Sequence, residues 1–328
     1  MRTRSLCAVA AFALAAPLAA QSVPSPHTEE YQAVQDRLPA AAADEQTDLA
    51  FKTDTYSRMT VPVRFTGRGS YRFLIDTGAD RTSISKQLAQ RLNLPAGRRA
   101  LLHSITSASE IETAKIPAIE LGKKTLWLSD APLLERANMG ADGILGTDSL
   151  RSQRVLFDFR AQTVSLISAT EKLLPEERNT IVVQGRRKNG RLILTRATAE
   201  GVPLELVVDT GAQISVGNEA LRRSLVRSGR LRSLGKAEMT SVTGETFVGE
   251  QLVVADLKVG SVELRGLPII FGDAHAFKPL GLAKRPALLL GMNAISSFDK
   301  VSIDFERKRL RLLLPARDGM ENQRLAFR

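Results

Sequence analysis

One short segment occurs twice in this chain, and the same neighbours follow it both times. The recurring pairs are FLIDTGA at residues 73–79 with LVVDTGA at 206–212, GILG at 143–146 with LLLG at 288–291, and LFDF at 156–159 with SIDF at 302–305. Three elements repeated in one order predict a duplicated domain. The offset between the copies is smaller at the first element than at the later two. We therefore expect an insertion in the second copy, in the loop at residues 272–286.

Short strand patterns dominate each copy. Residues 61–65 and 71–75 flank the turn TGRGS, which is typical of a β-hairpin. The second copy repeats this arrangement at residues 192–194 and 204–208, and a short helical pattern follows each Asp-Thr-Gly-Ala, at 85–92 and 218–226. Further strands of the first copy are expected at residues 101–106, 110–121, 125–128, 155–159 and 164–167. Many short strands and few helices indicate an all-β fold of sandwich or barrel type, built here as two tandem lobes.

Composition and residue types exclude several classes of site. The chain has 328 residues, of which 43% are apolar, as in ordinary globular proteins of one to three domains. A single Cys excludes an internal disulfide and a thiolate-rich metal cage. His27, His103 and His275 are isolated in the sequence, without the spacing of a metal site. The sequence also lacks the motifs of serine hydrolases, phosphate-binding loops and dinucleotide-binding folds. We expect no metal and no other cofactor.

The first twenty residues have the pattern of a secretory signal peptide. Arg2 and Arg4 precede an uncharged apolar run at residues 6–16, and small residues follow at 18–20. The run is shorter than the roughly 20 residues that span a bilayer, and no later stretch is longer, so no transmembrane anchor is expected. Export would place the protein in the periplasm of a Gram-negative bacterium, or otherwise outside the cell. A buried N-terminal helix is the alternative interpretation.

Charge is divided unevenly along the chain. The formal net charge is +11, yet residues 21–50 contain six acidic residues and one Arg, a net charge of −5. This composition predicts a flexible arm, and an inhibitory pro-segment is the alternative. A basic run follows in the second copy, at Arg222, Arg223, Arg227, Arg230, Arg232 and Lys236. It indicates either a solvated face or contact with an anionic envelope surface or an acidic substrate, and export argues against nucleic acid as a partner.

The two Asp-Thr-Gly-Ala segments carry a resemblance to a known family. Each is followed later in its own copy by an apolar-apolar-Gly element, which ends at Gly146 in the first copy and at Gly291 in the second. This arrangement resembles the aspartic proteases of the pepsin and retropepsin clan, and most of all the retropepsin-like aspartyl proteases of bacteria. The resemblance implies an all-β protein with two barrel lobes related by a pseudo-twofold axis and the active site between them. It divides the chain into a signal peptide (1–20), an arm (21–50), an N-terminal lobe (51–170), a linker (171–178), a C-terminal lobe (179–316) and a tail (317–328).

The resemblance also assigns roles to individual residues. Asp76 and Asp209 would form a catalytic pair that activates a water for attack on a peptide bond, since two carboxyls held together cannot both ionise easily. Supporting residues would be Thr77, Gly78, Ala79, Thr210, Gly211 and Ala212. Thr77 and Thr210 would hydrogen-bond across the two loops. Because each lobe supplies one Asp, a monomer suffices for the site. A lone Asp-Thr-Gly is usually a turn, but its duplication with the apolar-Gly partner favours catalysis.

Two departures from the family pattern affect the expected activity. Pepsin-like enzymes usually carry Ser or Thr where this chain has Ala79 and Ala212. Without that hydroxyl donor the carboxyl pKa should be higher, so we expect activity that extends toward neutral pH. Flaps that cover the substrate are expected at residues 103–109 and 240–245, with Thr106, Ser107, Thr243 and Gly244 at their tips. Neither segment contains the tyrosine of pepsin flaps.

The sequence therefore predicts an exported aspartic endopeptidase acting on proteins or peptides. A peptide-binding module that keeps the fold without catalysis is the alternative, and the two intact Asp-Thr-Gly triplets argue against it. A third possibility is an interfacial scaffold that uses the basic run. Asp158 and Asp304, which end the two equivalent strands, are expected to be structural residues that face a turn or a backbone partner.

Overall fold

The computed structural model describes residues 46–54, 58–128, 130–168, 179–227, 231–315 and 324–327. All of them belong to the compact body formed by residues 40–328. The expected signal peptide (1–20), the linker (171–178) and all of the arm before residue 46 lie outside the described residues.

The first lobe is built mainly of short strands. Its elements are β2 (Lys52–Thr53), β3 (Met59–Phe65), β4 (Gly69–Ile75), β5 (Ser83–Ser85), α2 (Lys86–Arg91), β6 (Ala100–His103), β7 (Ala108–Ile111), β8 (Thr113–Ala114), β9 (Ile119–Leu121), β10 (Lys124–Leu126), β11 (Ala131–Leu134), α3 (Arg136–Met139), β12 (Gly143–Leu145) and α4 (Thr147–Leu150). The main sheet has the order β10-β9-β3-β4-β12-β5-β11-β8, and β6 pairs with β7 in a separate hairpin. The predicted hairpin around TGRGS is β3 and β4, which pair antiparallel.

The second lobe repeats this arrangement with longer strands. Its elements are β16 (Arg191–Ala199), β17 (Val202–Val208), β18 (Ser215–Asn218), α5 (Glu219–Val226), β19 (Arg232–Thr240), β20 (Thr246–Val259), β21 (Val262–Gly272), η1 (His275–Phe277), β22 (Ala287–Leu290), α6 (Met292–Ile295) and β25 (Arg324–Ala326). Within the part of the chain that the structure describes, each helix is too short or too polar to cross a lipid bilayer.

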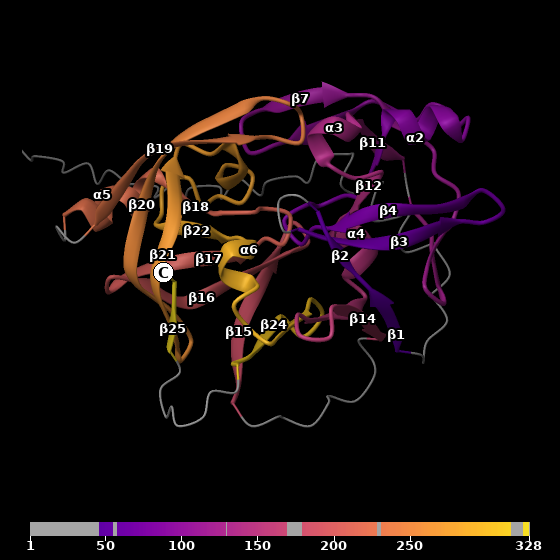
Figure 1. Ribbon diagram of the computed structural model, residues 1–328. Coiled ribbons are helices and arrows are strands. Elements are labelled where there is room, and N and C mark those ends of the chain that lie inside the picture. Colours follow the sequence, from indigo (N-terminus) through magenta and orange to yellow (C-terminus); the bar gives the residue numbers. More distant parts are fainter. Residues whose placement is uncertain are drawn as a thin grey trace, which may run out of the picture. The chain divides into compact units, whose positions relative to one another are not determined.

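Strands from both copies join in one sheet between the lobes (Figure 1). Six of its strands form the part shared by the two copies, in the order β1 (Thr47–Ala50), β14 (Thr163–Ser168), β13 (Gln153–Asp158), β23 (Lys300–Asp304), β24 (Arg309–Leu313) and β15 (Thr180–Lys188), and the sheet continues from β15 through β16 into the second lobe. In this shared part the strands of the two copies meet at β13 and β23. At its centre β13 and β23 pair antiparallel, with Leu156 opposite Ser302. These two residues are equivalent in the duplicated sequence, so the pairing is symmetric about this point. Two lobes related by an approximate twofold axis follow, as the repeat predicts.

The equivalent aspartates of this sheet have structural roles, as expected. The carboxylate of Asp158 accepts a hydrogen bond from the N–H of Ala161 at 2.8 Å, and that of Asp304 accepts one from the N–H of Arg307 at 2.8 Å. Across the central strand pair, the ammonium of Lys300 lies 3.7 Å from Asp158. Both carboxylates therefore close a turn after their strand.

Three sequence-based expectations about this region need correction. The single strand expected at 110–121 is divided, because β8 pairs with β11 and β9 with β3 and β10, while Pro117 between them has no N–H to donate. The last residues of the expected flexible arm form β1, which pairs with β14. Residues 324–326 of the expected tail form β25, which pairs with β21.

The insertion in the second copy lies only partly where the sequence placed it. The offset between equivalent residues grows in two steps, first between β18 and the end of β21 and again between β21 and β22. Part of the insertion therefore lengthens the hairpins before the end of β21, and the rest lies in the loop after it. That loop contains η1, and Phe277, Leu280 and Leu282 bury their side chains in an apolar cluster of the second lobe.

Candidate active site

Each candidate aspartate follows a strand at the centre of its lobe. Asp76 comes directly after β4, which pairs parallel with β12, and its N–H donates to the carbonyl of Leu145 at 3.0 Å. Asp209 comes directly after β17, which pairs parallel with β22, and its N–H donates to the carbonyl of Leu290 at 3.0 Å. These are the apolar strands that lead to Gly146 and Gly291 in the sequence. Two buried parallel strand pairs thus fix the backbone of both aspartates.

The loop after each aspartate turns back so that its N–H groups face the carboxylate. Oδ1 of Asp76 accepts hydrogen bonds from the N–H groups of Gly78 and Ala79 at 2.8 and 3.0 Å. Oδ1 of Asp209 accepts the equivalent bonds from Gly211 and Ala212 at 3.0 and 3.2 Å. As whole residues, both aspartates are half-buried. One oxygen of each is thus held by the loop.

The glycines of the two loops bring the carboxyls together across the lobe boundary. A Cβ atom placed on Gly78 would lie 2.5 Å from the carboxyl carbon of Asp209, and one on Gly211 would lie 2.3 Å from that of Asp76. Any side chain at either position would collide with the aspartate of the opposite lobe. Glycine is therefore required here for close approach rather than for a positive φ. Asp76 and Asp209 form one site.

The threonines of the motif connect the two loops. The hydroxyl of Thr77 donates to the carbonyl of Val208 at 2.8 Å and accepts from the N–H of Thr210 at 3.2 Å. In return, the hydroxyl of Thr210 donates to the carbonyl of Ile75 at 2.7 Å and accepts from the N–H of Thr77 at 3.1 Å. Both side chains are almost completely buried. This reciprocal network sets the spacing of the carboxyls, in the role that the resemblance assigns to the threonines.

Burial and mutual repulsion shift the titration of the pair. Burial and the neighbouring Asp76 carboxyl raise the pKa of Asp209 to about 7. Burial also raises the pKa of Asp76 above its ordinary value, against the opposing effects of the loop N–H groups and of Arg191. Two adjacent carboxyls cannot both ionise easily. These shifts favour one shared proton on the pair over two ionised carboxylates, which is the state that general acid and base catalysis uses.

Further hydrogen bonds connect the segment after each Asp-Thr-Gly-Ala to the glycine that follows the apolar strand. In the first lobe, the carboxylate of Asp148 accepts from the N–H and the hydroxyl of Thr82, and that hydroxyl accepts from the N–H of Gly146 at 3.1 Å. In the second lobe, Asn293 and Ser215 stand at the equivalent positions, and the hydroxyl of Ser215 accepts from the N–H of Gly291 at 3.0 Å. An acid and an amide thus perform one task in the two copies.

Sequence reasoning missed a cationic residue beside the pair. Arg191, at the start of β16, donates to the carbonyl of Gly78 and lies 3.2 Å from the carboxylate of Asp80. Its side chain is 9% exposed. Its charge acts on Asp76 and on Asp209, lowering the pKa of each. The only sequence signal was positional, since Arg58 stands as far before Asp76 as Arg191 stands before Asp209.

The expected flap residues lie at the turns of two hairpins. Thr106 and Ser107 belong to the turn between β6 and β7, and Thr243 and Gly244 belong to the turn between β19 and β20. Gly244 has a φ of 89°, which explains the glycine there, whereas the turn at Thr106 is one residue shorter and contains no residue with a positive φ. The two hairpins lie beside each other at the top of Figure 1.

Two histidines that are far apart in the sequence meet in the fold. Nδ1 of His103 and Nε2 of His275 lie 3.0 Å apart, and the rings stack with their centroids 5.3 Å apart. Among the described residues, no three His, Cys, Asp or Glu side chains are grouped as a metal ion would require. The pair therefore connects two segments, one from each lobe.

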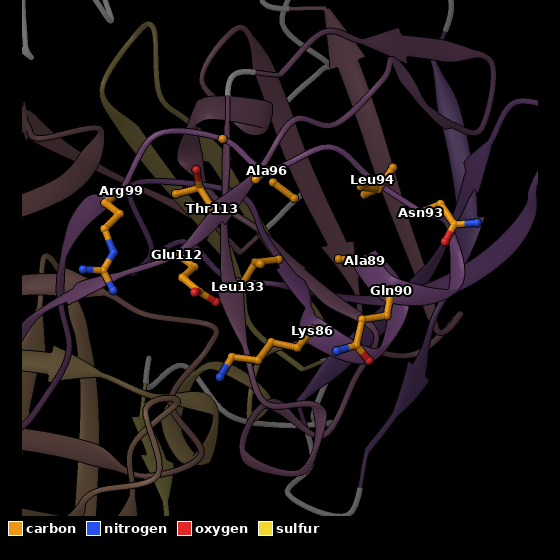
Figure 2. A pocket seen from close by; sticks show the side chains of 12 residues that line it. Lys86, Ala89, Gln90, Asn93, Leu94, Ala96, Arg99, Glu112, Thr113 and Leu133 are labelled. Carbon is orange, nitrogen blue, oxygen red and sulfur yellow. The ribbon is translucent and has the colours of Figure 1, made fainter.

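A pocket of about 600 Å³ lies beside α2 in the first lobe, away from the aspartate pair (Figure 2). Its apolar lining includes Ala89, Leu94 and Leu133, and the charged side chains of Lys86 and Glu112 stand at its rim. Neither aspartate of the pair lines it.

Comparison with known families agrees with this geometry. Residues 61–152 match the family described as gag-polyprotein putative aspartyl protease, and residues 195–294 match the family described as aspartyl protease. No curated protein matches the chain significantly. The fold and the site define an aspartyl protease architecture with one domain per lobe. The chain contains two aspartyl protease domains in tandem, an organisation consistent with a retropepsin-like protease of two lobes.

Proposed function

We propose that the chain is an aspartic endopeptidase that hydrolyses peptide bonds in proteins or peptides with Asp76 and Asp209 as the catalytic pair. The observation that carries this proposal is the reciprocal fit of each carboxyl against the glycine of the opposite loop. A chain that kept the fold for peptide binding alone would have no need of two carboxyls that each pack against the loop of the other. The raised pKa of Asp209 adds support, because it makes a shared proton available near neutral pH.

The chemistry follows from the geometry of the pair. A water held between the two carboxyls loses a proton to the ionised carboxylate as it attacks the scissile carbonyl. The protonated carboxyl donates its proton to the developing oxyanion. As the C–N bond breaks, the carboxyl that took the proton of the water passes it to the leaving amine, and a hydroxyl of the tetrahedral intermediate returns a proton to the other carboxylate. The loop N–H groups stabilise the ionised form of each aspartate. Because both carboxyls come from one chain, a monomer contains the complete site.

A peptide-library digest tests the assignment. Wild type, Asp76→Asn and Asp209→Asn are compared, with Glu238→Gln as a matched acid-to-amide change on the exposed part of β19. We expect each aspartate variant to lose about a thousandfold in turnover and Glu238→Gln to retain it. Equal cleavage by all four proteins would end the enzyme assignment. Peptide binding without cleavage by wild type would favour the binding module.

We propose further that the protein is exported, on the sequence of residues 1–20. An extracytoplasmic reporter fused after residue 30 should be active, and changing Arg2 and Arg4 to Glu should abolish its activity. Reporter activity that is independent of residues 1–20 would contradict export by a signal peptide. The basic run that includes Arg222 remains a proposal for contact with an anionic surface, to be tested by binding to anionic vesicles.

A further inference from the structure

The two flap turns are copies of one local structure. The N–H of Ser104 donates to the carbonyl of Ser107, and the N–H of Ser241 donates to the carbonyl of Glu245, both at 2.8 Å. Inside each turn the serine hydroxyl lies within hydrogen-bond distance of a threonine hydroxyl, that of Thr106 or of Thr243. The duplication thus gives each lobe a similarly folded flap tip. Their outward-facing residues differ, and those differences determine how the tips meet.

The carboxylate of Glu245 in the second flap hydrogen-bonds to the tip of the first flap. The two oxygens of Glu245 accept hydrogen bonds from the hydroxyl of Ser107 at 2.8 and 3.0 Å, and one of them also accepts from the hydroxyl of Thr106. These bonds join residues 138 or 139 positions apart in the chain. The equivalent position in the first flap is Ser107 itself. The contact between the two flap tips is therefore asymmetric, because the second flap supplies the carboxylate and the first flap supplies the hydroxyls.

A second contact joins the first flap to the insertion of the second lobe. The N–H of His275 donates to the carbonyl of Ile105 at 2.7 Å, in addition to the ring contact between His275 and His103. In a 3.0 Å contact between two ring nitrogens, one nitrogen must carry a hydrogen and the other must offer its lone pair. The contact therefore requires at least one neutral imidazole.

Apolar side chains of the flaps cross between the lobes. Ile105 of the first flap packs on the apolar cluster of the second lobe that contains Phe277. Val242 of the second flap packs on a cluster of the first lobe that contains Met139 and Ile144. The same cluster of the first lobe includes Leu74, two residues before the catalytic Asp76. Each flap tip therefore contacts the opposite lobe, and the contact of Val242 lies close to the catalytic pair. We call this arrangement of the flaps closed.

We propose that Glu245, His103 and His275 are positioning residues that hold the two flaps together, and that protonation of the histidine pair in mild acid releases the flaps for substrate entry. The role in substrate entry rests on the proposed peptidase function, whereas the contacts between the flaps do not depend on that function. The polar contacts are exposed, so each contributes little and can be broken reversibly.

The charged groups near His103 and His275 determine whether acid opens or closes the flaps. Burial, His103 and Lys278 lower the pKa of His275, while Asp273 opposes them. On the other side, Asp80 lies within electrostatic range of His103. A histidine whose pKa is lower in the closed state than in the open state favours closure above that pKa and opening below it. Thr106 and Ser107 lower the pKa of Glu245, so the contacts of that carboxylate persist in mild acid, while protonation of both rings would break the contact between His103 and His275.

Hydrogen exchange of the flap peptides tests this without measuring cleavage. The protein is studied as Asp209→Asn, so that neither the titration of Asp209 nor its coupling with Asp76 contributes. After correction for intrinsic exchange, amides of residues 100–111 and 240–250 should exchange about fivefold faster at pH 5.5 than at pH 7.5, the factor expected from about 1 kcal/mol between exposed like charges. His103→Gln should remove this step, and His27→Gln, the matched change at the third histidine, should retain it.

The carboxylate contact is tested by a second pair of variants in the same background. Glu245→Ala should raise flap exchange about fivefold at pH 7.5, and Glu245→Gln, which keeps one acceptor oxygen, should raise it less. Glu238→Ala on the same hairpin should change nothing. A pH step that persists in His103→Gln, or flap exchange unaffected by Glu245→Ala, would overturn the proposal. Loss of peptidase activity would bear on the proposed function alone.

Discussion

Arg58 and Arg191 are equivalent residues of the two lobes, yet Arg191 pairs with Asp80 across the lobe boundary whereas Arg58 pairs with Asp54 of its own lobe. The equivalence follows from strand register, since Thr60 pairs with Leu74 as their counterparts in the second copy, Ile193 and Val207, pair with each other. Arg191 lies 3.2 Å from Asp80 of the opposite lobe. Arg58 instead lies 2.7 Å from Asp54 and donates to the carbonyl of Met139, both in its own lobe.

The sequence explains this divergence. Asp80 follows the first Asp-Thr-Gly-Ala, but the equivalent residue after the second is Gln213. Arg58 therefore has no acid at the matching position across the boundary, and a local acid takes its place. A symmetric scaffold thus surrounds the pair of aspartates with an asymmetric charge distribution, because Arg191 acts on both aspartates whereas Arg58 acts on Asp76.

Removing the charge of Arg191 should shift the pH dependence of catalysis. Arg191 lowers the pKa of Asp76 and of Asp209, so Arg191→Met should raise both. The alkaline limb of kcat/KM should then move to higher pH. The protein should also lose about 2 kcal/mol of stability, since the carbonyl of Gly78 loses its donor. Peptide cleavage across pH and urea unfolding measure the two effects.

The matched control is Arg191→Lys, which keeps the charge but has a single ammonium in place of the guanidinium. Its alkaline limb should stay near that of wild type while part of the stability is lost. If Arg191→Met and Arg191→Lys gave the same pH profile, the electrostatic role of Arg191 would be wrong.

The repeat predicted that Asp76 and Asp209 occupy equivalent positions of the two lobes, because each occurs in a recognisable local motif. The contact of Arg191 with Asp80 could not be predicted, because neither residue belongs to a spaced motif and their meeting depends on how the lobes face each other. The meeting of His103 with His275 was missed for the same reason, since the sequence shows them only as isolated histidines. Contacts between the lobes depend on the tertiary structure, so a local residue pattern does not predict them.

The fold was predictable at the level of lobes and less so at the level of boundaries. Duplication and strand periodicity gave an all-β protein of two lobes. The division of residues 110–121 depended on which strands β8 and β9 would pair with, and β1 depended on a free edge of β14. The ends of these strands are determined by pairing with strands distant in sequence, which the β-propensity of the residues does not predict.

The threonine network should be more important for stability than for chemistry. Thr77→Val keeps the volume but removes a buried hydroxyl that donates to Val208 and accepts from Thr210, so we expect a loss of about 2 to 3 kcal/mol. Thr77→Ser keeps the hydroxyl and removes one methyl group, for about 1 kcal/mol. Urea unfolding of the two variants and wild type measures the difference. Equal destabilisation by Val and Ser would show that the hydroxyl does not connect the loops.

The alanines after the two glycines should set the upper end of the pH range. In Ala79→Ser and Ala212→Ser, the added hydroxyl can donate to an ionised carboxylate and lower its pKa. The alkaline limb of kcat/KM should therefore move toward acid in each variant, and further in the double variant. Ala79→Gly and Ala212→Gly, which add no donor, are the controls. A wild-type optimum below about pH 4 would contradict this explanation of the alanines.

Stability should depend on pH through the catalytic pair itself. The pKa of Asp209 is raised from 3.8 to about 7 on folding, so the folded state holds a proton that the unfolded chain has already released between these values. Stability from this group is fully present below about pH 4 and is lost as pH rises toward 7. Asp209→Asn removes the ionisation, and should therefore stabilise the protein by at least about 1 kcal/mol at pH 8 and hardly at all at pH 4. Urea unfolding at the two pH values measures this, with Glu238→Gln as the control for a surface acid. An equal effect of Asp209→Asn at both pH values would show that the carboxyl titrates normally, and the assignment of a shared proton near neutral pH would fail with it.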